Sequence, residues 1–214
     1  MEKELQKRIV SSIILLPLSF FFIIKGSVFF ILFLTVLFVI GCFEWFKISK
    51  KIEYKIIGTF FLLFSFYTVY FFRDRDLINF LLILIICITT DIGGYIFGKI
   101  FKGPRLIKIS PNKTYAGMIG SFLLSIIASF LFAIKYDSTF LQNQNLSEEI
   151  YFIFLVFLVS SVSQIGDLII SYFKRLSKIK NTGNIFPGHG GLLDRIDGMI
   201  FAFPFIFLVS KILL

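Results

Sequence analysis

Residues 77–98 read LINFLLILIICITTDIGGYIFG, an apolar run in which Asp91 is the one charged side chain. A helix that crosses a membrane needs about 20 mostly apolar residues. Further runs approach that length at 9–24, 27–43, 56–72, 117–134, 150–170 and 198–214. These runs predict an all-α, polytopic integral membrane protein with about seven transmembrane helices.

The composition excludes the common classes of soluble protein. The chain of 214 residues is 57% hydrophobic and 16% charged, and it contains 31 phenylalanines. An ordinary soluble domain is nearer half apolar and a quarter charged, and a chain of this size has too little interior to bury such a surplus. Cys42 and Cys87 both lie inside apolar runs, which argues against a disulfide or a zinc site.

The distribution of lysine and arginine predicts the orientation in the membrane. Cytoplasmic loops of membrane proteins are enriched in these residues. Most of the 22 lysines and arginines lie in the N-terminal tail and after the runs 27–43, 77–98 and 150–170. In a seven-span arrangement these segments share one side. We therefore expect a cytoplasmic N-terminus and two cytoplasmic loops, at 99–116 and 171–197.

The same reasoning gives the domain organisation. We expect a single transmembrane domain over 1–214, with N-terminal spans in 1–76 and a catalytic part in 77–214. The net charge of +9 comes from basic residues that lie next to apolar segments. Anionic lipid headgroups and phosphate-bearing substrates explain that placement, so no nucleic-acid partner is expected.

Two predicted spans contain a carboxylate, Asp91 and Asp167, near their cytoplasmic ends. A charged group inside a membrane is costly and needs a partner, a cavity or a function. Packing contacts between helices are one interpretation, and a proton or ion pathway of a secondary transporter is another. The adjoining loops favour a third, a surface site that binds phosphate.

The loop 171–197 reads SYFKRLSKIKNTGNIFPGHGGLLDRID and combines a basic cluster, a Pro/Gly turn and two carboxylates. Asp194 and Asp197, three residues apart, are expected on one face of a starting helix, with Arg195 pointing elsewhere. Carboxylate oxygens suit Mg²⁺, and arginine pairs with phosphate as a planar fork. The loop predicts binding of a polyphosphate with Mg²⁺. For His189, substrate binding, proton transfer and a structural role all stay open.

The loop 101–117, FKGPRLIKISPNKTYAG, offers a second group of phosphate-binding side chains. Ser110 and Thr114 bring hydroxyls, Lys113 brings an ammonium group, and Pro111 stiffens the turn. A plain surface turn is the alternative interpretation. The position of this loop on the same predicted face as 171–197 favours a shared site.

The residues of the loop 171–197 resemble, with unbroken spacing, the signature of phosphatidate cytidylyltransferases, also called CDP-diacylglycerol synthases. The residues that carry the resemblance are Ser171, Lys174, Arg175, Lys180, Gly183, Phe186, Pro187, Gly188, His189, Gly190, Gly191, Asp194, Arg195 and Asp197. Residues 91–95 and 110–114 resemble a second pattern of the family, and residues 166–168 a third. The family usually has an aspartate where this chain has Asn181 and a glutamate where it has Ala116; we expect activity despite both.

The resemblance implies that CTP and phosphatidic acid react to give CDP-diacylglycerol and pyrophosphate, with Mg²⁺ and a monovalent cation such as K⁺. It implies metal-binding roles for Asp167, Asp194 and Asp197. The implied catalytic set is Asp167, Lys174, Arg175, Asp194, Arg195 and Asp197. The implied substrate-binding set is Ser110, Lys113, Thr114, Ser171, Lys180, Gly188, His189, Gly190 and Gly191.

The resemblance also implies a location and partners. We expect an enzyme of the bacterial cell membrane, with its active site facing the cytoplasm, in contact with membrane lipids and able to form a homodimer. A CTP-dependent transferase or kinase that acts on another, isoprenoid-type lipid is the alternative within the same chemistry. A secondary transporter is the alternative from a different class, although the chain lacks the internal repeat that transporters often show.

Overall fold

A computed structural model describes residues 13, 15, 17–107, 110–136, 146–185 and 190–213 of the chain. Its elements are α2 (Ser27–Ile48), α3 (Ile52–Arg75), α4 (Leu77–Phe101), β1 (Arg105–Ile107), β2 (Ser110–Thr114), α5 (Tyr115–Tyr136), α6 (Leu146–Leu176), α7 (Leu193–Ile196) and α8 (Met199–Leu213). The helices confirm the predicted helical architecture. The antiparallel pair β1–β2 is an addition that the apolar pattern did not predict.

Five of these helices, α2 to α6, are long and apolar enough to cross a membrane. No more than about a third of the most apolar stretch of each is buried within the protein. Large side chains such as Phe60, which is 69% exposed, therefore need lipid as their surroundings. The chain is an integral membrane protein.

The predicted count of seven spans depends on the two ends of the chain. The run 9–24 begins outside the described residues, although residues 17–25 are helical. The run 198–214 corresponds to α8, whose 15 residues are about 22 Å long, shorter than the roughly 30 Å of a bilayer core. The seven spans and the cytoplasmic N-terminus therefore stay predictions.

Helix α6 continues to Leu176, so the predicted loop boundary at 171 is wrong. No glycine or proline interrupts the chain between Asp167 and Gly183, and basic side chains are favourable at the C-terminal end of a helix. The helix closes through Lys178, which has a φ of 57°, while the next amide, at Ile179, donates to the carbonyl of Lys174. Lys174 therefore stands on a rigid helix.

The predicted loop 99–116 is likewise mostly regular structure. Helix α4 continues to Phe101, and the chain then forms the hairpin, in which Arg105 pairs with Thr114. The hydroxyl of Thr114 accepts a hydrogen bond from the amide of Gly117, 3.1 Å away, and so caps the first turn of α5. The hairpin fixes the position of Lys113 relative to the helices.

Helices α4 and α5 lie against each other through glycines. A methyl group at Gly93 would lie 2.5 Å from the carbonyl oxygen of Gly120, a distance that side chains do not tolerate. The hydroxyl of Ser121 donates to the carbonyl of Thr90, at 2.7 Å. Small residues and interhelical hydrogen bonds are the main means of helix association in lipid, because burial of apolar surface gives no advantage there.

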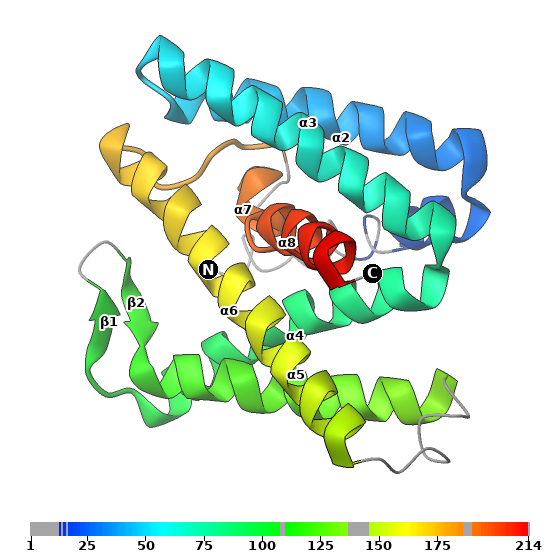
Figure 1. Ribbon diagram of the computed structural model, residues 1–214. Helices are drawn as coiled ribbons and strands as arrows, with labels where there is room; N and C mark the ends of the chain where they lie inside the picture. Colours follow the sequence, from blue (N-terminus) through cyan, green and yellow to red (C-terminus); the bar gives the residue numbers. More distant parts are fainter. Residues whose placement is uncertain are drawn as a thin grey trace.

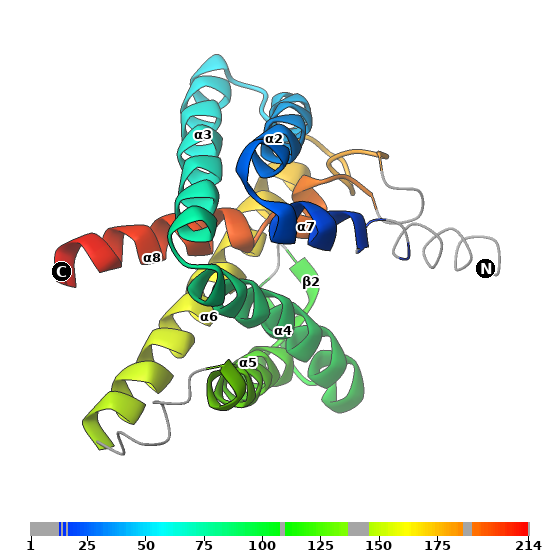
Figure 2. The same cartoon turned by 90° about the vertical axis from the view of Figure 1, so that its right-hand side faces the viewer.

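The helices gather their polar connections at one end (Figure 1). The turn between α2 and α3, the hairpin and the segment after α6 all lie on the left-hand side of that view. Helices α2 and α3 form one pair, α4 and α5 another, and α8 passes between the pairs, as the rotated view also shows (Figure 2). Phe30, Phe80 and Phe203 form part of the core between α2, α4 and α8.

We predict that Gly93→Ala lowers the stability of the protein in detergent. The added methyl group forces α4 and α5 apart, and such overpacking costs about 1–3 kcal/mol. Gly41→Ala is the matched control, because a methyl group there meets only Leu193 Cδ2, at an ordinary 3.7 Å. Thermal unfolding should show a lower midpoint for Gly93→Ala alone. Equal midpoints for both variants would contradict the close approach of α4 and α5.

Candidate active site

A cavity of about 370 Å³ brings together residues of the hairpin, α4, α5, α6 and the segment around α7. Its walls include eight of the predicted site residues: Ser110, Lys113, Thr114, Asp167, Lys174, Asp194, Arg195 and Asp197. Residues 110–114 are thus brought to the same cavity as residues 194–197. Arg195 shares the cavity with Asp194 and Asp197, so the prediction that it points elsewhere is wrong.

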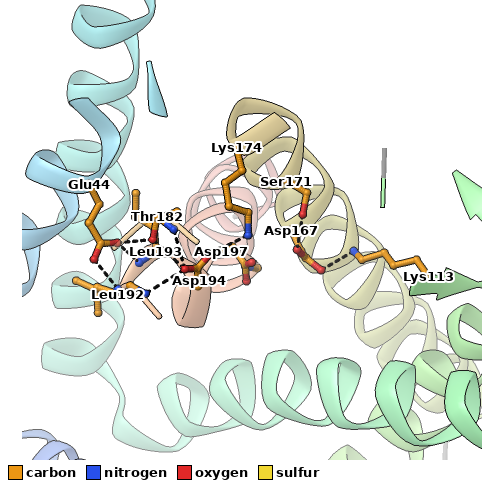
Figure 3. Close-up of polar contacts among 12 residues, drawn as sticks. Glu44, Lys113, Asp167, Ser171, Lys174, Thr182, Leu192, Leu193, Asp194 and Asp197 are labelled. Carbon is orange, nitrogen blue, oxygen red and sulfur yellow. Dashed lines mark hydrogen bonds and ion pairs between the residues drawn. The ribbon is translucent and has the colours of Figure 1, made fainter. Parts of the chain in front are cut away.

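Asp167 is held from two sides. Lys113 Nζ, from the hairpin, lies 2.5 Å from Asp167 Oδ2, and the hydroxyl of Ser171 donates to Asp167 Oδ1 at 3.3 Å (Figure 3). Lys113 also donates to the carbonyl of Gln164, one turn earlier on α6. The ion pair therefore fastens the hairpin to α6 across the cavity.

Asp194 accepts four interactions, which occupy both of its oxygens. Lys174 Nζ lies 2.7 Å from Oδ1 in an ion pair whose side chains are only 12% and 10% exposed. Oδ2 accepts from the amide of Thr182 at 2.8 Å, from its hydroxyl at 3.1 Å and from the amide of Gly191 at 3.0 Å. Asp194 thus holds Thr182 and Gly191 and orients Lys174 (Figure 3).

Asp197 is in the opposite situation, because it is buried among like charges. The residue is 7% exposed, and the amide of Gly198 donates to its Oδ1 at 2.9 Å. Burial raises the pKa of Asp197 well above its usual range, and the negative charges of Asp167 and Asp91 raise it further, against a smaller opposite effect of Lys174. A cation beside Asp197 and Asp167 would relieve this repulsion.

The family resemblance implies that Asp167, Asp194 and Asp197 bind Mg²⁺. Within the described part of the chain, no three His, Cys, Asp or Glu side chains lie in a group able to hold a metal ion. Asp194 is engaged by hydrogen-bond donors, which separates it from the other two predicted ligands. Asp167 and Asp197 do interact with each other, and their oxygens fit a hard cation such as Mg²⁺.

The remaining predicted residues fall into three groups. All of Ser171, Gly190 and Gly191 are buried; Ser171 donates to Asp167, Gly191 donates to Asp194, and Gly190 lies close to Asp194. Arg175 and Lys180 are exposed and do not line the cavity. Gly188 and His189 lie outside the described residues, so their predicted roles in substrate binding stay predictions.

Several residues in or beside the cavity were not among the predicted functional residues, and they include Glu44, Asp91 and Gln164. Glu44 of α2 is 2% exposed and binds the segment that carries Asp194. Its signal in the sequence is that it is the one acidic residue in the run 27–52. Asp91, noticed in its span, and Gln164 both line the cavity. The Nε2 atom of Gln164 is buried and has no hydrogen-bond partner among the described residues.

Residues 53–213 match the sequence model of the Cytidylyltransferase family. The chain belongs to the cytidylyltransferase family. It is 33% identical over 220 residues to the phosphatidate cytidylyltransferase of Rickettsia felis, covering 98% of this chain and 93% of that protein. It is 34% identical over 218 residues to the enzyme of the same name from Rickettsia bellii, covering 100% and 94%.

A more distant relative agrees. The phosphatidate cytidylyltransferase of Haemophilus influenzae is 36% identical over 126 residues, which cover 58% of this chain and 43% of that protein. These relatives confirm the family resemblance that the signature residues 171–197 predicted. Glu44 lies outside the residues that match the family model, whereas Asp167, Asp194 and Asp197 lie inside them.

We predict that Asp197→Asn stabilises the protein in the absence of divalent cations. An acid whose pKa is raised by folding makes the protein less stable as the pH rises from its unfolded pKa, about 3.9, to its folded pKa. An amide does not ionise, so the variant avoids this loss. Thermal unfolding in EDTA at pH 7 should give a higher midpoint for Asp197→Asn, and the difference should vanish near pH 4. A lower midpoint at pH 7 would contradict the burial of an unneutralised Asp197.

Proposed function

We propose that the chain transfers the cytidylyl group of CTP to phosphatidic acid and so forms CDP-diacylglycerol and pyrophosphate. The observation that carries the proposal is the single cavity in which Asp167 and Asp197 lie beside Lys113, Lys174 and Arg195. Family membership and the names of the relatives support the same reaction. CDP-diacylglycerol is a precursor for phospholipids, which assigns the enzyme to phospholipid biosynthesis.

The reaction places few demands on acid–base chemistry. A phosphate oxygen of phosphatidic acid attacks the α-phosphorus of CTP; a new P–O bond forms, and the bond to the pyrophosphate oxygen breaks. The attacking oxygen is already anionic, so no strong base is required. The difficulty is that two anions must approach in line, which positioning and positive charge overcome.

The residues of the cavity divide this task. Lys174, held by Asp194, and Arg195 supply positive charge near the base of the cavity, and Lys113 supplies it from the hairpin. The hydroxyls of Ser110 and Thr114 on the same hairpin offer hydrogen bonds to phosphate oxygens. Binding of an anionic substrate competes with Asp167 for Lys113, so the ion pair keeps the hairpin in place until substrate binds.

We assign a Mg²⁺ ion to Asp167 and Asp197, two carboxylates that line the same cavity and whose charges repel each other. When bound, this ion neutralises the charge that develops on the phosphates. The carboxylates that hold it have to be deprotonated, and because the pKa of Asp197 is raised, binding should tighten as the pH rises. A K⁺ ion has no assigned ligands in this proposal.

We also propose that the cavity faces the cytoplasm from a bacterial cell membrane. CTP then enters from water, and phosphatidic acid enters from the adjoining leaflet. The exposed basic residues at this end of the helices, among them Arg175, Lys178 and Lys180, suit the anionic lipid surface. The seven spans, the cytoplasmic N-terminus and a homodimer belong to the same proposal.

The purified protein should convert phosphatidic acid and radiolabelled CTP into a CDP-lipid when Mg²⁺ is present. Asp167→Asn and Lys174→Met should each lower kcat by about 100-fold or more, because each removes a charge from the reacting phosphates. Asp74→Asn, an exposed carboxylate in the last turn of α3, is the matched control and should keep its activity. If a product forms from an isoprenoid phosphate but not from phosphatidic acid, the proposed lipid substrate is wrong. If no product forms from either lipid, the proposed function is overturned.

The orientation can be tested with single cysteines in a variant that lacks Cys42 and Cys87. Asp74→Cys lies at the end of α3 opposite the hairpin, whereas Lys178→Cys lies beside the end of α6 near the cavity. In intact cells, a membrane-impermeant maleimide should label Asp74→Cys, and it should label Lys178→Cys only after permeabilisation. The reverse pattern would place the cavity on the outer face.

A further inference from the structure

Glu44 is a charged residue buried at the junction between α2 and the segment that precedes α7. Glu44 Oε2 accepts a hydrogen bond from the hydroxyl of Thr182 at 2.6 Å and from the amide of Leu193 at 2.8 Å. Its Oε1 accepts from the amide of Leu192 at 2.8 Å (Figure 3). All three donors belong to the segment 182–193, and they are more than 130 residues away along the chain.

These hydrogen bonds decide whether the charge of Glu44 can be buried at all. A carboxylate removed from water without donors is strongly destabilising, whereas three short hydrogen bonds offset most of that cost. Because each donor comes from the segment 182–193, the burial of Glu44 and the position of that segment depend on each other. The carboxylate therefore acts as a template for the segment.

The glycines of the segment have this carboxylate as a close neighbour. A methyl group at Gly183 would overlap Glu44 Oε1, and one at Gly191 would overlap the hydroxyl of Thr182 and lie 2.5 Å from Glu44 Oε2. The backbone therefore passes the carboxylate on two sides with no room for a side chain. Glycine at 183 and 191 is explained by the approach to Glu44, with no bound ligand required.

Thr182 connects Glu44 to the cavity. Its hydroxyl hydrogen can serve one acceptor at a time, and the 2.6 Å contact to Glu44 is shorter than the 3.1 Å contact to Asp194. The amide of Thr182 donates to Asp194 Oδ2, while Asp194 Oδ1 holds the ammonium group of Lys174. A continuous series of contacts thus runs from α2 to a cation in the cavity wall.

We propose that Glu44 is a positioning residue for the active site: it fixes Thr182, Leu192 and Leu193 so that Asp194 holds Lys174 in the cavity. Glu44 does not line the cavity and so acts through Thr182 and Asp194. It precedes the residues that match the family model, so the N-terminal helix α2 supplies part of the active site's framework. The expected change in kcat rests on the proposed function, whereas the expected change in amide exchange does not.

The first test measures the segment directly and requires no activity. Glu44→Gln keeps the shape of the side chain but turns one acceptor into a donor that faces backbone N–H groups. Hydrogen–deuterium exchange of the full-length protein in detergent should become at least about ten-fold faster at amides within 182–193. Ser177→Ala is the matched control. It removes another contact of α2, from the hydroxyl of Ser177, just after α6, to the carbonyl of Ile48, without touching Glu44. Unchanged exchange in Glu44→Gln, or equal acceleration in Ser177→Ala, would overturn the proposal.

The second test asks whether Glu44 acts through Lys174. Glu44→Gln should lower kcat for CDP-lipid formation by about ten-fold or more, which corresponds to about 1.4 kcal/mol. In the Lys174→Met background the same substitution should have little further effect, because the group that it positions is absent. If the double variant loses kcat by the product of the two single effects, Glu44 does not act through Lys174, and the proposal is overturned. Thr182→Val should change amide exchange and kcat in the same way as Glu44→Gln. Thr182→Ser keeps the hydroxyl and should match the wild type in both measurements. These two variants test the proposal even if Glu44→Gln does not fold.

If the wild-type protein makes no CDP-lipid, the proposed function fails while the exchange experiment still decides the role of Glu44. If the wild type is active and exchange is unchanged in both Glu44→Gln and Thr182→Val, the positioning role alone is wrong. The two failures are therefore distinguishable.

Discussion

A buried carboxylate in an apolar helical bundle must be surrounded by donors or cations, and this constraint organises the protein around its cavity. Glu44 of α2 accepts hydrogen bonds from residues just before and within α7. Asp194 pairs with Lys174 of α6, and Asp167 pairs with Lys113 of the hairpin. Apolar contacts alone give helices in lipid little preference for one partner over another. Polar contacts between distant segments therefore specify how the elements meet.

Two carboxylates of the cavity repel each other, although one of them, Asp167, is paired with Lys113. Asp167 and Asp197 interact with each other near Asp91, and burial makes the charge on Asp197 costly. Sites that bind cations or anionic substrates often keep unfavourable electrostatics that the ligand relieves, at a cost in stability. Asp194 and Asp197 lie three residues apart, yet Asp194 is surrounded by donors, whereas Asp197 faces other carboxylates. We therefore assign a framework role to Asp194 and a cation-binding role to Asp197.

The sequence was informative where the signal is local. Apolar runs predicted the long helices, the spacing of the signature residues predicted the family, and the two loops together supplied eight of the residues that line the cavity. The extension of α6 past residue 170 was missed because basic residues were taken as the end of a span, although they also suit a helix C-terminus. The hairpin was missed because strands of three and five residues leave only a weak pattern.

Partnerships between distant residues were the least predictable. A lone glutamate in an apolar run gives no indication of its partners, and those of Glu44 lie 138 to 149 residues away. Asp194 and Asp197 share residue type and local spacing, so only their contacts distinguish an aspartate that orients Lys174 from one that faces other carboxylates. Such roles follow from tertiary packing, which composition and periodicity do not encode.

The central claim is that one cavity between the hairpin and the α7 segment binds the triphosphate of CTP. An experimental structure of the protein with CTP, in which Mn²⁺ replaces Mg²⁺, tests this most directly. We expect triphosphate density in contact with Lys113, Lys174 and Arg195, and a manganese peak within coordinating distance of Asp167 and Asp197. Nucleotide density outside this cavity, or manganese bound away from both carboxylates, would contradict the claim.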